Sequence, residues 1–374
     1  MRIAIDTRLA YYRQGGIANY AQHIAQALPA LDPDNRYLLL HSRKHAGALA
    51  APPPAPNAAR GALWTPCHHR FEAYTLAAEL LPRRLDLLHS PDFIPPRGGA
   101  RRYVITVHDL NFLHYPHFLT ADAYRYYNGQ IARAVRQAHH ILADSQATKN
   151  DLVAMLGVPA DKITVHMLGV EPAFSPQPTA VVDALRARLD LPAGYLLFVG
   201  TFEPRKNLPG LLRAFRLLRD ELPDAPPLAL AGRPGWLYED VVDLVRALDL
   251  TAHVHWLEDV PQADLPALYT GASVFVMPSF YEGFGLPALE AMACGTPVVA
   301  SERASLPEVV GHTAGVLVNP DDAANIAGGL RAALTDSALR ERLTREGLAR
   351  ARTFTWRRTA EVALSAYRAA LSAL

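Results

Sequence analysis

The sequence predicts an α/β protein with two Rossmann-like domains, each a doubly wound parallel sheet, facing each other across a cleft. Three observations carry this prediction. Short apolar, β-branched runs alternate with amphipathic helical stretches, which is typical of parallel sheets with helices on both faces. The alternating series occurs twice along the chain. At 374 residues the chain is also too long for one ordinary core.

The first domain is expected over residues 1–175. A strand at 2–6 is followed by a helix at 17–28 whose apolar residues recur on one face. Further strands are expected at 37–40, 85–89, 103–107, 140–143 and 163–167. The stretch 49–62 is rich in proline and alanine, so it is expected to be an exposed loop without regular structure.

The second domain is expected over residues 176–354, after a linker at 169–178. Its predicted strands are 195–199, 228–231, 254–256, 273–277, 297–300 and 315–318. In sheets of this kind ligands bind at the carboxyl ends of the strands, so polar residues there are the candidates for chemistry. The last stretch, 355–374, predicts one amphipathic helix.

Composition narrows the class of protein. Half of the residues are hydrophobic and a fifth are charged, as in globular proteins, and the net charge of +1 gives no indication of nucleic acid as a partner. Two cysteines are too few for a disulfide framework, which favours a reducing cytoplasm. Neither a signal peptide nor an apolar run of membrane-spanning length is expected, so any membrane contact would be peripheral, at the inner face of the plasma membrane.

The most informative stretch is residues 278–297, PSFYEGFGLPALEAMACGTP. A buried strand precedes it, and a glycine turn then opens a helix at Gly285-Leu286. Free N–H groups at such a helix start can hold an anion such as a diphosphate. Glu282 lies before the helix and Glu290 about one turn inside it, so the two carboxylates should reach different parts of one ligand. The alternative is a surface turn with two solvated glutamates.

A second motif, GTFEPRKN, follows the first strand of the second domain. Gly200 permits close approach of the backbone to a ligand. Arg205 and Lys206 place two cations in one loop, where they would neutralise a diphosphate. A solvated basic pair at a helix entry is the alternative.

Two features of the first domain point to the same cleft. Gly15-Gly16 opens the helix after the first strand, although a glycine pair also suits a flexible turn. His108 ends a strand, where it can donate or accept near neutral pH. Asp109 either orients His108 or an acceptor hydroxyl, or caps the next turn. His89 is as compatible with a packed core histidine as with a site residue.

Two other stretches are ambiguous. Arg233 leaves a strand end and could stack on a nucleobase, but loop arginines are usually solvated. Residues 68–85 have apolar residues at helical spacing and basic ends, the pattern of a membrane-lying helix. Glu72 and Glu79 weaken that interpretation, so packing against the first sheet is favoured.

The two glutamates and the basic pair give the chain its resemblance to a known family. The resemblance is to retaining, nucleotide-sugar-dependent glycosyltransferases of the GT-B fold (glycosyltransferase family 4), especially bacterial polysaccharide mannosyltransferases. It covers nearly the whole chain and is strongest over residues 200–297. The resemblance implies that the last helix packs back on the first domain. It also implies catalytic roles for His108, Arg205, Lys206 and Glu282. The donor-binding residues that it implies are Gly16, Gly200, Thr201, Phe284, Gly285, Leu286 and Glu290.

The function predicted is transfer of a hexose, with mannose from GDP-mannose as the first guess, to a hydroxyl of a glycan or lipid-linked glycan. No metal ion or other cofactor is expected, and no aspartate-x-aspartate motif lies at a strand end. Glu282 should bind donor sugar hydroxyls and Glu290 ribose hydroxyls, while the general base is left open. A nucleotide-sugar epimerase and a non-catalytic sugar-nucleotide-binding protein remain as alternatives.

Overall fold

The structure, a computed structural model, describes residues 1–12, 15–118, 121–235 and 238–372. The chain divides into two compact units. Unit 1 comprises Met1–Gly169 and Thr355–Leu374, and unit 2 comprises Val170–Phe354. The division falls within residues 166–178, which contain neither helix nor strand.

Unit 1 is built on a seven-stranded sheet in which all neighbouring strands pair in parallel, in the order β3-β2-β1-β4-β5-β6-β7. The chain winds outward from β1 to β3 and then, from β4, in the other direction. The switch point is therefore between β1 and β4. The strands are β1 (Arg2–Asp6), β2 (Arg36–Ser42), β3 (Ala58–Leu63), β4 (Leu85–Ser90), β5 (Ala100–Val107), β6 (His140–Ala143) and β7 (Ile163–Val165).

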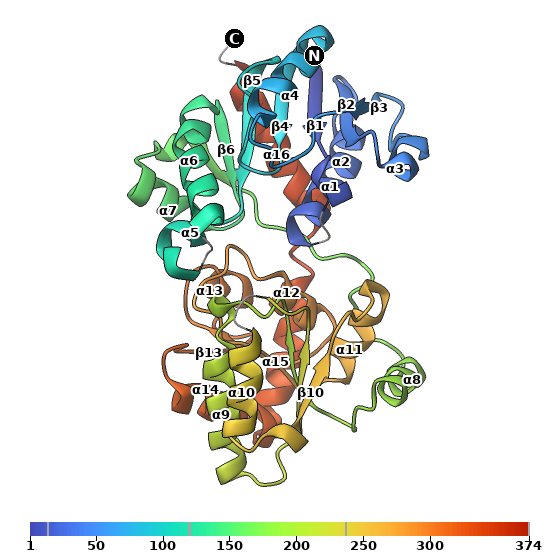
Figure 1. Cartoon of the computed structure of the whole chain (residues 1–374). Helices are drawn as coiled ribbons and strands as arrows, with labels where there is room; N and C mark the ends of the chain where they lie inside the picture. The colour runs from blue at the N-terminus through green and yellow to red at the C-terminus, as the bar shows by residue number, and fades with distance from the viewer. Residues whose placement is uncertain (13–14, 119–120, 236–237, 373–374) are drawn as a thin grey trace. The chain divides into compact units, whose positions relative to one another are not determined.

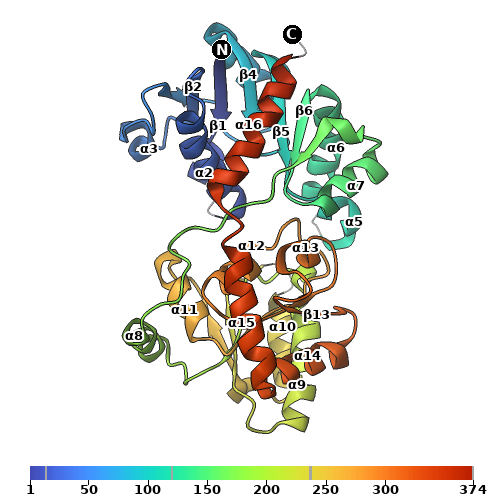
Figure 2. The same ribbon diagram turned by 180° about the vertical axis from the view of Figure 1, so that it is seen from behind.

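Helices cover both faces of this sheet. Figure 2 shows α16, the last helix, lying across the strands beside α2, and α16 contacts β4, β5, β6 and β7. Apolar residues of α4 and α6 pack on the sheet in separate core clusters. The helices of unit 1 are α1 (Leu9–Tyr12), α2 (Gly16–Leu31), α3 (Ala46–Ala50), α4 (Glu72–Leu80), α5 (Asn111–His114), α6 (Ala121–Gln137), α7 (Gln146–Leu156) and α16 (Trp356–Ser372).

Unit 2 repeats the architecture with a six-stranded parallel sheet in the order β10-β9-β8-β11-β12-β13. Its switch point lies between β8 and β11. Their buried apolar residues, such as Phe198 and Val276, belong to the core of the unit. The strands are β8 (Leu196–Val199), β9 (Leu228–Ala231), β10 (Val254–Leu257), β11 (Val274–Met277), β12 (Val298–Ser301) and β13 (Val316–Val318).

The helices of unit 2 form two layers. Helices α9, α10 and α14 lie on the side seen in Figure 1, and α8, α11, α12 and α15 on the side seen in Figure 2. Their bounds are α8 (Thr179–Leu189), α9 (Leu208–Glu221), α10 (Tyr238–Ala247), α11 (Leu265–Gly271), α12 (Leu286–Ala293), α13 (Leu306–Val310), α14 (Ala323–Thr335) and α15 (Ser337–Ala351).

The predicted strands are found within three residues of their expected bounds, but the loop expected at 49–62 is confirmed only for residues 51–57. Helix α3 ends inside this stretch, and β3 begins at Ala58 and pairs with β2 from Tyr37 onward. Alanine, arginine and glycine give β3 little intrinsic strand preference. Pairing with β2 and burial of Leu63 override that preference.

The last helix begins at Trp356 and packs in unit 1, while residues 373–374 of its predicted range lie outside those described. Between 68 and 85 the helix is shorter than its pattern, because α4 begins only at Glu72. Leu76 and Leu80 pack against the unit 1 sheet, which confirms the favoured interpretation. None of the described helices is long and apolar enough to cross a membrane.

Candidate active site

The loop after β8 carries the basic pair and is held in place by two close approaches. A Cβ on Gly232 would lie 1.9 Å from the Gly200 carbonyl oxygen, so only glycine permits the loops after β8 and β9 to meet. Asn207, at φ 58°, accepts from the Gly210 N–H and donates to the Pro278 and Pro320 carbonyls. The loop after β8 is thereby tied to the end of β11.

Arg205, Lys206 and Glu282 meet at this switch point. The Lys206 ammonium donates to Glu282 Oε1 at 2.6 Å, and Arg205 Nη1 donates to Glu282 Oε2 at 2.8 Å. Glu203 accepts from Arg205 Nε at 3.1 Å. Lys206 and Glu282 are buried, and Arg205 is partly buried. The basic pair is thus positioned by two carboxylates and is not a solvated surface pair.

The charges in this cluster shift one another's pKa values. Burial by itself would raise the pKa of Glu282, but the Lys206 and Arg205 cations lower it to about 2. Burial and the neighbouring Arg205 lower the pKa of Lys206, and Glu282 opposes that shift. A carboxylate has room for about four hydrogen bonds. Glu282 therefore keeps acceptor capacity for the sugar hydroxyls that the sequence assigned to it.

Helix α12 begins at Leu286, four residues after Glu282. Its N-cap, Gly285, has φ 101°, and a Cβ there would lie 2.6 Å from Leu306 Cδ2, so glycine is required. The preceding Phe284 is buried, and its carbonyl lies 2.8 Å from the Ser305 hydroxyl. Within the first turn of α12, Pro287 has no N–H and the Ala288 N–H donates to the Gly285 carbonyl. The N–H groups of Gly285 and Leu286 point away from the helix bonds and can bind an anion.

Glu290 lies one turn inside α12 and interacts with a different partner. Tyr269 of α11 donates its hydroxyl to Glu290 Oε2 at 2.8 Å. Burial raises the pKa of Glu290 to about 7, although the Tyr269 hydrogen bond acts in the opposite direction. Glu290 is therefore separate from the cation-bound Glu282, and near neutral pH it lies close to the midpoint of its titration.

His108, at the end of β5 in unit 1, is held between two acceptors. Its Nδ1 lies 2.7 Å from Asp144 Oδ2, and its Nε2 lies 2.7 Å from the Pro91 carbonyl oxygen. Because both partners only accept, both ring nitrogens donate and the imidazole is the cation. Burial lowers the pKa of His108, but Asp144 outweighs burial and raises it to about 9.

The neighbours of His108 form a buried polar cluster. Tyr20 of α2, the helix that begins at Gly16, packs edge-on against the His108 ring at 5.2 Å between centroids. His166 Nε2 lies 3.6 Å from Asp144 Oδ1. His89 is fully buried and bonded to Thr106 and Tyr367, so it is a packed core histidine.

Sequence reasoning missed Asp144 and His166. The available signal was position, because Asp144 directly follows β6, the neighbour of β5. Asp109, considered as an orienting group, instead accepts from the Asn111 N–H and caps a turn. Arg233 is exposed and pairs with Asp259. Thr201 is exposed at the end of β8, and nothing in its contacts assigns it a ligand.

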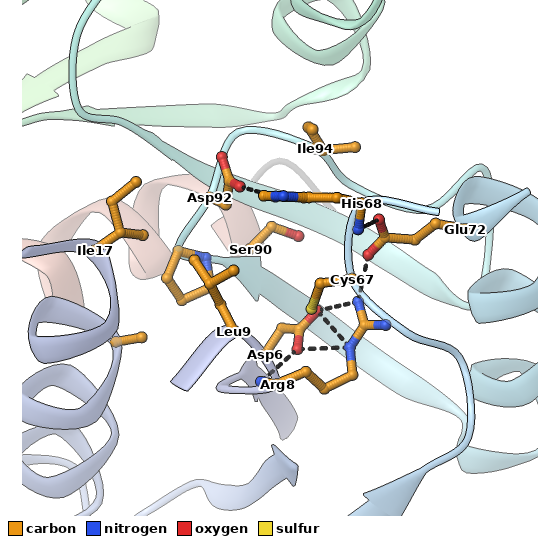
Figure 3. A pocket seen from close by; sticks show the side chains of 12 residues that line it. Asp6, Arg8, Leu9, Ile17, Cys67, His68, Glu72, Ser90, Asp92 and Ile94 are labelled. Atoms are coloured by element: carbon orange, nitrogen blue, oxygen red, sulfur yellow. Dashed lines mark hydrogen bonds and ion pairs between the residues drawn. The ribbon is translucent and has the colours of Figure 1, made fainter. Parts of the chain in front are cut away.

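A pocket opens at the switch point of unit 1, between the ends of β1 and β4 (Figure 3). Arg8, buried in its floor, donates to Asp6, to Glu72 and to the Thr65 carbonyl. At its rim His68 Nε2 lies 2.8 Å from Asp92 Oδ2.

Ser90 also lines this pocket. It is 3% exposed, and its hydroxyl has no hydrogen-bond partner among the described residues. The open interior is about the size of one water molecule. The pocket thus presents a buried, unpaired hydroxyl to any group of hydroxyl size that enters.

Two protein-family models match the chain. Residues 185–350 match the family described as Glycosyl transferases group 1, and residues 14–174 match the one described as Glycosyltransferase Family 4. Together the two matches include every predicted site residue of both units.

Relatives with curated descriptions include sugar transferases. The chain is 38% identical to O-antigen chain mannosyltransferase B of Escherichia coli, over 75% of this chain and 74% of that protein. It is 32% identical to the serotype-specific mannosyltransferase WbdA of Escherichia coli, over 73% of this chain but 34% of WbdA. Identity to D-inositol 3-phosphate glycosyltransferase of Kineococcus radiotolerans is 36%, over 64% of this chain and 59% of that protein.

Solved structures resemble the chain over its full length. Sucrose-phosphate synthase from Thermosynechococcus elongatus superposes with a TM-score of 0.80 at 22% identity, covering 100% of both chains. HepE from Anabaena, solved in complex with UDP-glucose, superposes with a TM-score of 0.75 at 19% identity, also covering 100% of both chains. At these identities the likeness shows the fold alone.

Proposed function

The chain belongs to the group 1 glycosyltransferases and has their GT-B fold, and from that premise we propose that it is a retaining hexosyltransferase of cell-surface polysaccharide synthesis. Its substrates would be a nucleoside diphosphate sugar and a hydroxyl of a glycan or lipid-linked glycan. The observation that carries the proposal is the cluster of Arg205, Lys206 and Glu282 beside the start of α12.

Mannose is the sugar that the relatives favour, and GDP-mannose is the donor we propose. The relative with 38% identity is named an O-antigen chain mannosyltransferase, and WbdA is named a serotype-specific mannosyltransferase. Among the residues of unit 2 that the structure describes, no contact selects guanine over uracil. The relatives therefore support the proposed donor, and the geometry of the site supports the proposed chemistry.

In the proposed reaction the bond between the sugar's anomeric carbon and the diphosphate oxygen breaks while the acceptor oxygen bonds to the same face of that carbon. The acceptor proton passes to the departing diphosphate. Arg205, Lys206 and the N–H groups at the start of α12 stabilise the charge that develops on the diphosphate. Glu282 accepts from sugar hydroxyls and Glu290 accepts from ribose hydroxyls. The Nε2–H of the His108 cation leaves the Pro91 carbonyl and donates to the donor sugar instead.

Two protein cations and a helix start supply the positive charge that a metal ion would otherwise bring to a diphosphate. We therefore expect no requirement for a metal ion or other cofactor. The measurement is the transfer rate after dialysis against a chelator, compared with the rate after readdition of Mg²⁺ or Mn²⁺. A rate that falls to background and returns with the metal would contradict this expectation.

For the acceptor, we infer that one hydroxyl enters the pocket at the switch point of unit 1. Ser90 offers a buried hydroxyl without a partner, and the His68–Asp92 pair offers a second polar contact at the rim. Ser90→Ala removes no existing hydrogen bond, so the fold should be unaffected. KM for the acceptor should rise while donor affinity stays unchanged. Unchanged acceptor KM in Ser90→Ala and in Asp92→Asn would exclude the pocket.

The deciding experiment for the function is a thermal-shift panel of GDP-mannose, GDP, UDP-glucose and UDP, followed by transfer assays with the donor that stabilises most. A ligand at 100 times its Kd stabilises the folded state by about 2.7 kcal/mol. We expect GDP-mannose to stabilise and to yield a mannosylated acceptor with retained anomeric configuration. Epimerised donor without transfer would indicate an epimerase, and binding without turnover a binding protein.

A further inference from the structure

One face of α4 in unit 1 exposes large apolar side chains. Phe71, Tyr74 and Leu81 are 49%, 58% and 70% exposed and recur at helical spacing on one side of the helix and its continuation. Trp64, in the loop before α4, is 70% exposed. These four residues form what we call the α4 face. Ordinary surface helices place polar residues on this side, so the pattern needs an explanation.

The acidic residues of this helix do not reach that face. Glu72 is buried, where it accepts from Arg8 Nη2 at 2.8 Å. Glu79 accepts from the backbone N–H groups of Trp64 and Thr65, at 2.6 and 3.1 Å, which fixes the Trp64 backbone beside α4. In the sequence these two glutamates argue against a membrane-facing helix. The structure removes that objection, because one is buried and both are bonded within the unit.

The α4 face is also basic. Arg43 lies over the Trp64 ring at 3.4 Å, Arg70 over Phe71 at 4.6 Å and Arg97 over Tyr74 at 4.9 Å. Stacking occupies the flat face of a guanidinium and leaves its N–H edges pointing outward, in the plane that suits a phosphate. Residues 43–101, all of which the structure describes, contain eight Lys and Arg residues but only four Asp and Glu residues. None of these four acidic residues is exposed.

Exposed aromatic rings that each carry an arginine match the boundary between lipid headgroups and acyl chains. Aromatic rings insert at headgroup depth, arginines reach the phosphates, and each basic residue near an anionic leaflet adds to the attraction. A protein partner of comparable apolar area would need acidic groups opposite the three stacked arginines. We propose that the α4 face docks unit 1 on the surface of an anionic lipid bilayer.

This inference rests on the proposed function for its purpose, since docking would bring unit 1 to a lipid-linked acceptor. Its test needs neither donor nor acceptor, so the two can fail separately. The full chain is mixed with sedimentable vesicles of phosphatidylglycerol and phosphatidylethanolamine, or of phosphatidylcholine alone. Binding is measured by co-sedimentation at low and high salt. We expect binding to the anionic vesicles only, weakened by salt.

The double variant Trp64→Ser with Tyr74→Ser should weaken this binding about tenfold or more, because two rings lose their apolar contact with lipid. Its matched control is Leu217→Ser on α9, which removes a 40% exposed apolar residue from unit 2 and should bind like the wild type. Arg70→Gln with Arg97→Gln should reduce the dependence on salt. Thermal unfolding shows whether each variant retains its fold.

Four outcomes would overturn the proposal. The wild type could fail to bind anionic vesicles, or bind phosphatidylcholine equally well. The Trp64 and Tyr74 variant could bind as the wild type does. Sedimentation velocity could instead reveal a concentration-dependent dimer that the same double variant abolishes, in which case the α4 face is an interface between two copies of this chain.

Discussion

Lys206 and Glu282 form a buried ion pair, with 2.6 Å between the ammonium nitrogen and Oε1, although 76 residues separate them in the chain. The parallel sheet brings them together, because β8 and β11 are neighbours and both loops leave at the carboxyl edge. Burying one such charge without the other would be costly. The pair therefore has a structural role in addition to its proposed role at the diphosphate.

The first prediction concerns this double role. Lys206→Ala and Arg205→Ala should each lower turnover by about a hundredfold or more, the range for one lost charge partner in the transition state. Lys206→Ala should also destabilise the fold by about 3 kcal/mol, because it leaves the buried Glu282 carboxylate without one of its two cationic partners. Arg205 is more exposed, so its loss should affect stability less. Chemical denaturation and steady-state kinetics measure the two effects.

A double variant provides the control. In Lys206→Met with Glu282→Gln both members of the pair are neutral, so much of the stability lost in Lys206→Ala should return while turnover stays low. If stability and turnover recovered together, the loss of rate would reflect unfolding and the diphosphate role would be wrong.

The second prediction separates the two glutamates of the 278–297 stretch. Ribose is present in both nucleotide and nucleotide sugar, so Glu290→Gln should weaken binding of the free nucleoside diphosphate. Glu282→Gln should leave that binding nearly intact and lower transfer. Titration calorimetry with the nucleotide that stabilises the protein most gives the comparison. The reverse pattern would exchange the two roles.

The third prediction uses the pKa of Glu290. Burial raises this pKa to about 7, while the hydrogen bond from Tyr269 acts to lower it. Roughly half of the Glu290 carboxyl groups therefore carry a proton at pH 7. Ribose hydroxyls donate to the ionised form, and binding should therefore release roughly half a proton per nucleotide at that pH. Calorimetry at pH 7 in buffers of different ionisation enthalpy measures the released fraction.

Two variants bracket that measurement. Tyr269→Phe removes the hydrogen bond that lowers the pKa, so more protons should be released on binding at pH 7. Glu290→Gln has no carboxyl group at this site, so it should release no proton from it on binding. Equal enthalpies in all buffers for the wild type would show that nucleotide binding does not ionise Glu290.

The fold was predictable because its signal is local. Buried parallel strands are continuous apolar runs, and β9 and β6 have their predicted bounds. The strand β3 was not predictable, because its alanines and glycine form a strand only through pairing with β2. Strand order is also absent from the sequence pattern, yet it decides which loops share a switch point.

The site was predictable only in part for the same reason. A glycine turn before a helix and a basic pair are local patterns, so Gly285 and Lys206 could be identified from the sequence. The partners of the histidine could not. Asp144 meets His108 across 36 residues through the pairing of β5 with β6. Each residue follows a strand that the sequence predicts, but the strand order that makes these two strands neighbours is absent from the sequence pattern.

The last prediction concerns the charge on His108. Asp144 opposes burial and raises the folded-state pKa of His108 to about 9, above its ordinary value of 6.5. A raised pKa stabilises the folded protein fully below the unfolded value and less as pH rises through the folded value. Thermal stability should therefore decline between about pH 6.5 and pH 9 in the wild type, and this component of the decline should be absent in His108→Gln.

NMR gives the same quantity directly. Among the 15 histidines, the signal that disappears in His108→Gln should titrate near pH 9. Burial lowers the pKa of the neighbouring His89 and His166, so their signals should titrate below pH 6.5 and provide internal controls. Asp144→Asn should bring the His108 transition down, because the amide cannot stabilise the cation. A wild-type transition near pH 6.5 would mean that His108 is neutral at physiological pH and cannot act as the cationic donor to the sugar.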